Sequence, residues 1–310
     1  MSTRSRRSAL LLLSAFLLAA SILPAQTLTI YYTASLRGNL DGCSCERNRV
    51  AGLVKRAAYL RALPRGAADL RLDAGDILEA SGDPDLSREI LAVYRELDYA
   101  AVGVGETELS EGAQALAAYS RRFPFLAHNL SIRAPSGRWA PLSAKPFLLS
   151  RAGLRIAILA VIDPQVLAEH KELKEGRIRL EDPGLAVARL AGESRRQGAR
   201  LVIVLFHGPD ADARRLAEQE PAVDLLLFGH QGWIVPPEKA GRTLVASPGE
   251  NGNRMGVLTL RLGASGVESF EHRLVAFDYS KDPDDAGVRA RVQAYRQKLQ
   301  ARLRAEDEAR

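Results

Sequence analysis

Short, nearly continuous apolar runs recur along the chain, with amphipathic segments between them. Three such runs are Leu154–Ile162, Leu201–Phe206 and Val223–Phe228. A strand that is apolar on both faces needs a cover on both faces. Segments such as Val50–Leu63, where apolar residues recur at helical spacing, predict helices that supply this cover. The alternation predicts an α/β fold with buried sheets flanked by helices.

The remaining elements follow from the same patterns, and residues 131–153, with five Pro or Gly positions, predict an irregular excursion. The predicted helices are Val50–Leu63, Leu86–Leu97, Glu111–Arg121 and Pro183–Arg196, followed by a charged, solvated terminal helix in the tail from Asp282 to Arg310. The predicted strands are Thr27–Thr33, the run from Leu70 to Gly75-Asp76, Tyr99–Val104, Phe123–Ala127, Phe147–Ser150, Leu154–Ile162, Leu201–Phe206, Val223–Phe228, Thr243–Ala246, Met255–Leu262 and Val267–Phe277.

The first 25 residues have the layout of a secretory signal peptide. Three arginines precede an apolar run from Ala9 to Leu23, and the small-residue site Leu23-Pro-Ala25 follows. The run is short for a membrane span, and an uncleaved N-terminal anchor is the alternative. The layout predicts an exported protein, periplasmic or secreted, that has no membrane contact after signal cleavage.

The formal charge of the 310-residue chain is +6, but part of it belongs to the N-terminus. Residues 1–25 hold three of the 43 basic residues and none of the 37 acidic ones, which leaves +3 for the rest. No basic segment is interleaved with aromatic residues, as a nucleic-acid groove would require. We therefore expect no nucleic-acid partner.

The only two cysteines, Cys43 and Cys45, stand in one Cys-Ser-Cys. One such pair is not a disulfide framework, and a bond between residues two apart closes a small, strained ring that is easily reduced. The pair is predicted to be reactive or metal-binding rather than structural.

Polar residues follow four predicted strands at the point where each strand ends. They are Asp76, Glu106 or Glu108, His207 and His230. In α/β sheets, ligands gather at the carboxyl ends of the strands, and two carboxylates with two imidazoles suit a transition metal. The alternatives are that Asp76 caps the next helix and that each histidine is simply a satisfied, partly buried residue. We assign that second role to His128, His170 and His272.

The sequence motifs at these strand ends resemble those of the catalytic domain of periplasmic 5′-nucleotidases, within the calcineurin-like metallophosphoesterases. The resemblance covers about residues 27–278. It rests on Leu72-Asp-Ala-Gly-Asp76, Val102-Gly-Val-Gly-Glu-Thr-Glu-Leu109, Phe125-Leu-Ala-His-Asn129, Val202-Ile-Val-Leu-Phe-His-Gly208, Asp224-Leu-Leu-Leu-Phe-Gly-His230 and Ser247-Pro-Gly-Glu-Asn-Gly252. Six motifs in the same order make the resemblance specific.

The resemblance implies a four-layer αββα fold with two mixed sheets flanked by helices. Together with the signal-peptide layout and the charged tail, it divides the chain into a signal peptide (1–25), a metallophosphoesterase-like domain (26–280) and a charged C-terminal helix (281–310), with no 5′-nucleotidase C-terminal domain. It also implies a metal-dependent hydrolase of small phosphoesters, nucleotide-like or other, as the activity.

Four departures from the family motifs shape this expectation. Ser35-Leu-Arg37-Gly38 stands where the family has Asp-x-His-Gly, Glu106 replaces the Asn ligand, Thr107 replaces the general-acid His, and Gly232 replaces the second His of the last motif. By resemblance, the losses fall on one of two metal positions. We therefore expect one divalent transition ion, Zn²⁺, Mn²⁺ or Fe²⁺, held by the set Asp76, Glu106, His207 and His230.

Arg37 is expected to project into the vacated second position, where its fixed positive charge would bind a phosphate. A guanidinium cannot lower the pKa of a water as a metal does, so hydrolysis is expected to be slow or altered. The alternatives are a non-hydrolytic redox or metal-binding protein that uses Cys43 and Cys45, and a pseudoenzyme. The sequence leaves the oligomeric state open.

Overall fold

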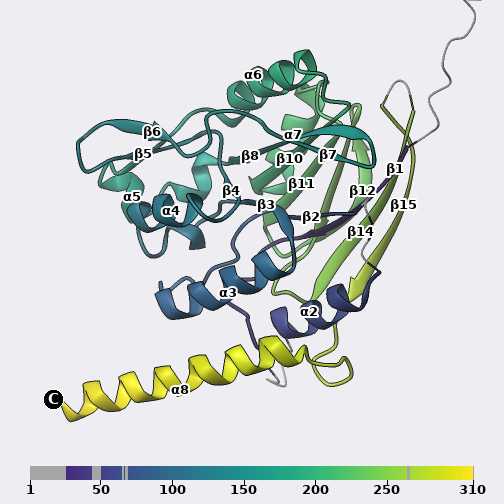
Figure 1. Ribbon diagram of the computed structural model, residues 1–310. Coiled ribbons are helices and arrows are strands. Elements are labelled where there is room, and N and C mark those ends of the chain that lie inside the picture. Colours follow the sequence, from purple (N-terminus) through teal and green to yellow (C-terminus); the bar gives the residue numbers. More distant parts are fainter. Residues whose placement is uncertain (1–25, 44–49, 65, 67–68, 264–265, 310) are drawn as a thin grey trace, which may run out of the picture.

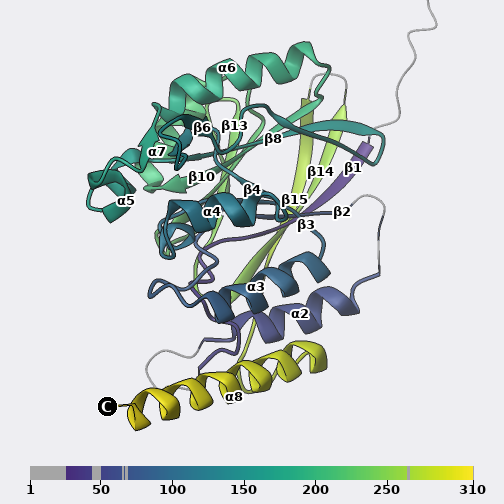
Figure 2. The same ribbon diagram turned by 60° about the vertical axis from the view of Figure 1, so that its left-hand side comes forward.

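Two six-stranded sheets pack face to face, and helices cover the outer face of each, as Figures 1 and 2 show. The computed structural model describes residues 26–43, 50–64, 66, 69–263 and 266–309. The predicted signal peptide lies outside the described residues. The arrangement is a four-layer αββα sandwich, and it confirms the predicted α/β class with two mixed sheets.

The first sheet has a parallel half and an antiparallel half. Its strands, in spatial order, are β15 (Gly266–Ala276), β14 (Arg254–Gly263), β1 (Gln26–Thr33), β2 (Asp69–Asp73), β3 (Tyr99–Gly103) and β4 (Phe125–Leu126). β1 to β4 run parallel, whereas β14 is antiparallel to both β1 and β15. The carboxyl ends of four neighbouring strands therefore share one edge.

The second sheet has four parallel strands between two antiparallel edge strands. Its spatial order is β12 (Ile234–Ala240), β13 (Thr243–Pro248), β11 (Leu225–His230), β10 (Leu201–Gly208), β8 (Leu154–Ile162) and β7 (Phe147–Arg151). β13, β11, β10 and β8 are parallel, and β12 and β7 pair antiparallel at the edges.

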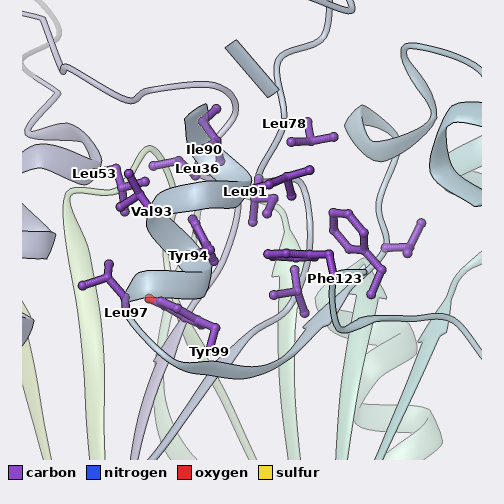
Figure 3. Close-up of a cluster of buried hydrophobic side chains, with 14 of the residues drawn as sticks. Leu36, Leu53, Leu78, Ile90, Leu91, Val93, Tyr94, Leu97, Tyr99 and Phe123 are labelled. Atoms are coloured by element: carbon purple, nitrogen blue, oxygen red, sulfur yellow. The ribbon is translucent and has the colours of Figure 1, made fainter. Parts of the chain in front are cut away.

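Alternate apolar residues of each strand form the core between the sheets. Leu72 of β2 and Leu205 of β10 belong to this cluster, and both are buried. The other faces pack on helices: α2 (Gly52–Ala62) and α3 (Pro84–Glu96) on the first sheet, with α4 (Ala113–Ser120) beside β4, and α6 (Pro183–Arg196) and α7 (Asp210–Gln219) on the second. Figure 3 shows the first of these outer clusters, where Leu53 and Ile90 lie near Tyr94.

The expectation of an irregular excursion over residues 131–153 is wrong in part. β5 (Leu130–Arg133), β6 (Trp139–Pro141) and β9 (Ile178–Leu180) form a separate antiparallel sheet. The helical turns η1 (Thr107–Leu109), η2 (Pro164–Leu167) and α5 (Lys171–Lys174) were also not predicted. The central strand of the small sheet pairs with a strand more than 40 residues later, and such distant pairing leaves no local pattern in the sequence.

The predicted terminal helix is present as α8 (Ala286–Glu308), but it is not solvated along its whole length. Val288 and Val292 are buried, and ion pairs join Arg291 to Glu89 of α3 and Arg302 to Asp83. Figure 2 shows α8 lying across α2 and α3. Among the described residues, no helix is long and apolar enough to cross a membrane.

A buried polar network stands behind the turn that follows β2. Tyr94 receives a hydrogen bond from Arg56 Nη2 at 2.6 Å and donates to Asp73 Oδ2 at 2.9 Å. Arg56 of α2 has no exposed surface and lies against the Tyr94 and Tyr99 rings. Burial raises the pKa of Asp73, and the Arg56 charge lowers it. The guanidinium therefore compensates a carboxylate in the protein interior.

We expect Arg56→Met to lower the free energy of unfolding by about 3 kcal/mol, because removal of one partner leaves a buried charge uncompensated. Urea denaturation measures this loss. Arg61→Met, on the same helix, is the control. Arg61 forms half-exposed ion pairs, and its loss should cost less than about 1 kcal/mol. Equal losses in the two variants would contradict the role of Arg56.

Candidate metal centre

Parallel strands of both sheets end at one edge of the sandwich, and four of their end residues converge there. Asp76 and Glu106 follow β2 and β3 of the first sheet, whereas His207 and His230 end β10 and β11 of the second. One ligand atom from each residue lies within 4.8 Å of the others. The structure thus brings together the four residues singled out from the sequence.

The turn after β2 presents Asp76 to this edge. Gly75 and Asp76 both have a left-handed backbone, with φ of 98° and 60°, and Asp76 is buried. Its Oδ1 accepts a hydrogen bond from the backbone N–H of Thr107 at 3.0 Å. Helix α3 is capped instead by Asp83, which accepts from two backbone N–H groups. The alternative of a helix cap therefore fails for Asp76.

Glu108 holds this turn in place and is not part of the cluster. Its buried carboxylate accepts from four backbone N–H groups, those of Gly105, Asp76, Ile77 and Leu78, at 2.7–3.2 Å. Burial, with the nearby Asp76 charge, raises the pKa of Glu108 to about 7. The choice between Glu106 and Glu108 thus resolves to Glu106 facing the cluster and Glu108 ordering the backbone around it.

His207 connects the two sheets at the centre of the cluster. Its Nδ1 lies 2.9 Å from the carbonyl oxygen of Ala74, on the first sheet's side. An Nδ1–H donated to that carbonyl leaves Nε2 free for a ligand. Nε2 lies 2.6 Å from Glu106 Oε2 and 3.6 Å from Asp76 Oδ2. The orientation is the one that a metal-binding imidazole needs.

His230 approaches Glu106 from the other side. Its φ is 96°, and its backbone N–H donates to Ser35 Oγ at 3.2 Å. Its Nδ1 lies 2.9 Å from Glu106 Oε1, so the carboxylate of Glu106 bridges the two imidazoles. The ring is about one quarter exposed, which leaves an open side to the cluster.

Gly105 shows how tightly the cluster is packed. A Cβ at this position would lie 2.3 Å from Asp76 Oδ1 and 2.5 Å from the His207 ring. No side chain fits there without moving the candidate ligands. The glycine before Glu106 is therefore required for the close approach of β3 to His207.

The donor set fits a divalent transition metal. Two imidazole nitrogens and two carboxylates are a mixed N/O set, and bonds to such ligands are about 2.0–2.2 Å long. Donors on opposite sides of one ion then stand about 4 Å apart, within the 4.8 Å that encloses this cluster. Asp76, Glu106, His207 and His230 could therefore hold one ion.

The charges of the cluster reinforce one another. Burial opposes ionisation of Glu106, but hydrogen bonds to His207 and His230 hold its pKa well below the usual range. Burial likewise disfavours the charged form of His207, but the Asp76 and Glu106 carboxylates raise its pKa to about 9. Without an ion, His207 therefore carries a proton at neutral pH that a metal must displace.

Arg37 lies at the rim of the cluster, as expected, but its guanidinium already has partners. Nη2 donates to the His230 carbonyl at 2.8 Å, Nη1 lies 3.0 Å from Glu250 Oε2, and Nε is 3.7 Å from Asp76 Oδ2. The side chain is 39% exposed, so a ligand from solvent could reach it.

Glu250 was not singled out from the sequence as a site residue. It follows β13, and its carboxylate lies against Gly232, where a Cβ would be 2.7 Å from Glu250 Cδ and Oε1. The absence of a side chain at Gly232 thus makes room for Glu250. The sequence offers one signal for Glu250, which is its position after a predicted strand, in the segment Ser247-Pro-Gly-Glu250.

Thr107, at the family's general-acid position, is buried and turned away from that role. Its hydroxyl is directed at Glu108 Oε1, 3.5 Å away, while its backbone N–H orients Asp76. The residue therefore positions a candidate ligand and presents no acidic proton to a leaving group.

Of the two cysteines, only Cys43 is among the described residues. It is disulfide-bonded, and its backbone N–H and carbonyl pair with Val50 on the loop between β1 and α2. Cys45 lies outside the described residues. The predicted reactivity of the pair stays a prediction.

The other three histidines have ordinary partners. His128 Nδ1 accepts from the backbone N–H of Ala160 at 2.9 Å. His170 caps α5, and His272 Nε2 lies 3.0 Å from the Tyr32 hydroxyl. The assignment of these histidines to satisfied structural positions is confirmed.

A separate cavity of about 880 Å³, which Arg195 and Phe270 help to line, includes no residue of the metal cluster.

We expect the apparent affinity for Zn²⁺ or Mn²⁺ to rise about tenfold between pH 7 and pH 8. The His207 pKa of about 9 means that one proton leaves for each ion bound in this range. Competition with a chelating dye at several pH values measures the slope. A flat affinity above pH 7, as two unshifted histidines would give, would contradict this electrostatic picture.

No family model matches the chain, but individual proteins do. It is 29% identical over 217 residues to a 2′,3′-cyclic-nucleotide 2′-phosphodiesterase/3′-nucleotidase of Yersinia enterocolitica, a match that covers 60% of this chain and 33% of the relative. The Salmonella typhimurium protein of the same name is 26% identical over 256 residues, which cover 72% of this chain and 40% of that relative. The chain thus spans a third to two fifths of the length of these relatives.

Solved structures share the same architecture. The 5′-nucleotidase precursor of Thermus thermophilus superimposes with a TM-score of 0.76 and 21% identity, over 89% of this chain and 59% of that chain. Together, the sequence matches and the shared fold confirm the predicted resemblance to the 5′-nucleotidase family of the calcineurin-like metallophosphoesterases.

Proposed function

We propose that the chain is an exported, metal-dependent hydrolase of small phosphoesters of the nucleotide class. The observation that carries this proposal is the convergence of Asp76, Glu106, His207 and His230 at one edge of the sandwich. The printed names of the relatives, which are nucleotide phosphoesterases, support the substrate class. Export rests on the signal-peptide pattern of residues 1–25. The proposed catalytic body is residues 26–280.

In this proposal, the chain's own residues divide the work between holding an ion and holding an anion. Asp76, Glu106, His207 and His230 would hold a divalent ion, which when bound would polarise a phosphoryl oxygen and lower the pKa of a water. Ala74 fixes the His207 ring by accepting its Nδ1–H.

Arg37 binds the phosphoryl oxygens. Of its five N–H donors, three face the His230 carbonyl, Glu250 and Asp76, which leaves two for a ligand, and guanidinium groups suit phosphate geometry. Thr107 cannot protonate the leaving group, because a hydroxyl directed at Glu108 is a very weak acid. The proposed reaction is therefore slower than in a site with a histidine there.

Only one ion is proposed. At the second metal position implied by the family motifs, Ser35, Arg37 and Gly232 stand where ligands would be needed, and the Arg37 guanidinium is 3.7 Å from Asp76. A fixed positive charge at that distance opposes a second cation. Asp76 then serves one ion and not two.

Protein loaded with Mn²⁺, Zn²⁺ or Fe²⁺ should hydrolyse p-nitrophenyl phosphate or nucleotides, and His207→Ala should reduce the rate by at least about 100-fold. A steady-state assay of both proteins tests this. Replacement of Cys43 and Cys45 by serine is the matched control and should leave the rate within about twofold. Wild-type turnover no higher than that of the His207→Ala variant would contradict the proposed hydrolase function. A redox activity that the wild-type protein has and the cysteine variant lacks would favour the redox alternative.

Metal analysis of protein equilibrated with excess ion and then desalted should give one equivalent per chain. His207→Ala should bring it near zero, because the ring supplies one of four donors. Two equivalents would contradict the single-ion site. No bound metal would favour a pseudoenzyme.

A further inference from the structure

The Arg37–Glu250 pair fixes the charge of the candidate site, and this charge bears on the substrate. Arg37 Nη1 and Glu250 Oε2 are 3.0 Å apart, and both side chains are about one third exposed. Glu250 reaches this place because Gly232 has no side chain. The loops that carry the pair are joined by a hydrogen bond from Asn251 N to Ser35 O at 2.8 Å. The pair is therefore built into the site.

Glu250 adds a third carboxylate beside those of Asp76 and Glu106. Against these three stand one guanidinium and, on the proposed function, one divalent ion. Apart from Glu108, whose buried carboxylate is occupied by four backbone N–H groups, the groups around the anion position therefore have no net charge. A second cation in place of the pair would leave an excess of two positive charges. A phosphomonoester, which is mostly a dianion above pH 7, therefore gains little electrostatic attraction here. Compared with a site that holds two cations, a monoanionic diester loses less of this attraction than the dianion does.

We propose that Glu250 is a specificity-determining residue that favours monoanionic phosphodiesters over dianionic phosphomonoesters. The inference rests on the proposed function for the presence of the ion. Glu250 also leaves Arg37 two free donors, enough for the two non-bridging oxygens of a diester. The third non-bridging oxygen of a monoester finds the Glu250 carboxylate nearby instead of a cation.

The test compares two probes on metal-loaded protein at pH 8, methyl phosphate as the dianion and dimethyl phosphate as the monoanion, by titration calorimetry. Glu250→Gln keeps the size of the side chain and an acceptor for Arg37, but removes the charge. Electrostatic energy scales with ligand charge, so the variant should bind dimethyl phosphate about fivefold more tightly and methyl phosphate about 25-fold, the square of that factor.

Two further variants separate charge from structure. Glu250→Asp keeps the charge and should keep the ratio of the two affinities within about twofold, even if Arg37 is less well held. Glu238→Gln is the control. It removes a carboxylate of β12 that pairs with Arg214 of α7, outside the metal cluster, and it should change neither affinity. Equal shifts for both probes in Glu250→Gln, or weaker binding of methyl phosphate, would overturn the proposal.

The binding assay needs no turnover, so it distinguishes this inference from the proposed hydrolysis. If wild-type protein binds both probes but hydrolyses neither p-nitrophenyl phosphate nor its diester, the proposed hydrolase function is wrong. The affinity changes of the two probes in Glu250→Gln then still decide the role of Glu250. If the metal-loaded protein binds neither probe at millimolar concentration, there is no anion site and the inference is wrong.

Discussion

The close approach of the two sheets at their carboxyl ends is the constraint on which the site depends. Two candidate ligands come from each sheet, so neither sheet alone holds a complete set. The hydrogen bond between His207 and the Ala74 carbonyl crosses from one sheet to the other. At Gly229 a Cβ would lie 2.9 Å from the Cβ of Ala34, which shows that the layers touch here. The apolar core between the sheets thus sets the spacing of the polar cluster at its edge.

This spacing is reached at a cost in backbone energy. Five of the seven described non-glycine residues with positive φ gather at this edge, namely Ser35, Arg37, Asp76, His230 and Asn251. Each left-handed residue costs on the order of 1 kcal/mol. The Glu108 carboxylate offsets part of this cost, since it satisfies four backbone N–H groups of the strained turns. Asp73, in the same motif as Asp76, faces inward and accepts a hydrogen bond from Tyr94 in the protein interior. The two aspartates therefore differ in role, because Asp73 stabilises the interior and Asp76 belongs to the metal cluster.

The sequence predicted the parts of the site that local pattern can reveal. Asp76, Glu106, His207 and His230 each follow an apolar strand, and parallel strands end at a common edge. Local pattern left the choice between Glu106 and Glu108 open, because it depends on which carboxylate meets the turn's N–H groups, and only the family resemblance favoured Glu106. Glu250 was missed, since its importance arises from the missing side chain at Gly232, and that pairing exists only once the second sheet is formed. The small sheet and the packed half of α8 were missed for the same reason, because both depend on contacts between distant segments.

On the proposed function, anion binding and bond breaking both depend on the metal ion. Arg37 is charged at every accessible pH, but without an ion the carboxylates of Asp76, Glu106 and Glu250 outnumber it, so an oxyanion is not attracted. Activation of water also requires the metal, and metal binding must displace the proton that Asp76 and Glu106 stabilise on His207. The same carboxylates thus favour the ion and favour its competitor. Anion binding and catalysis would then both follow metal supply and pH, because the ion that both require competes with a proton.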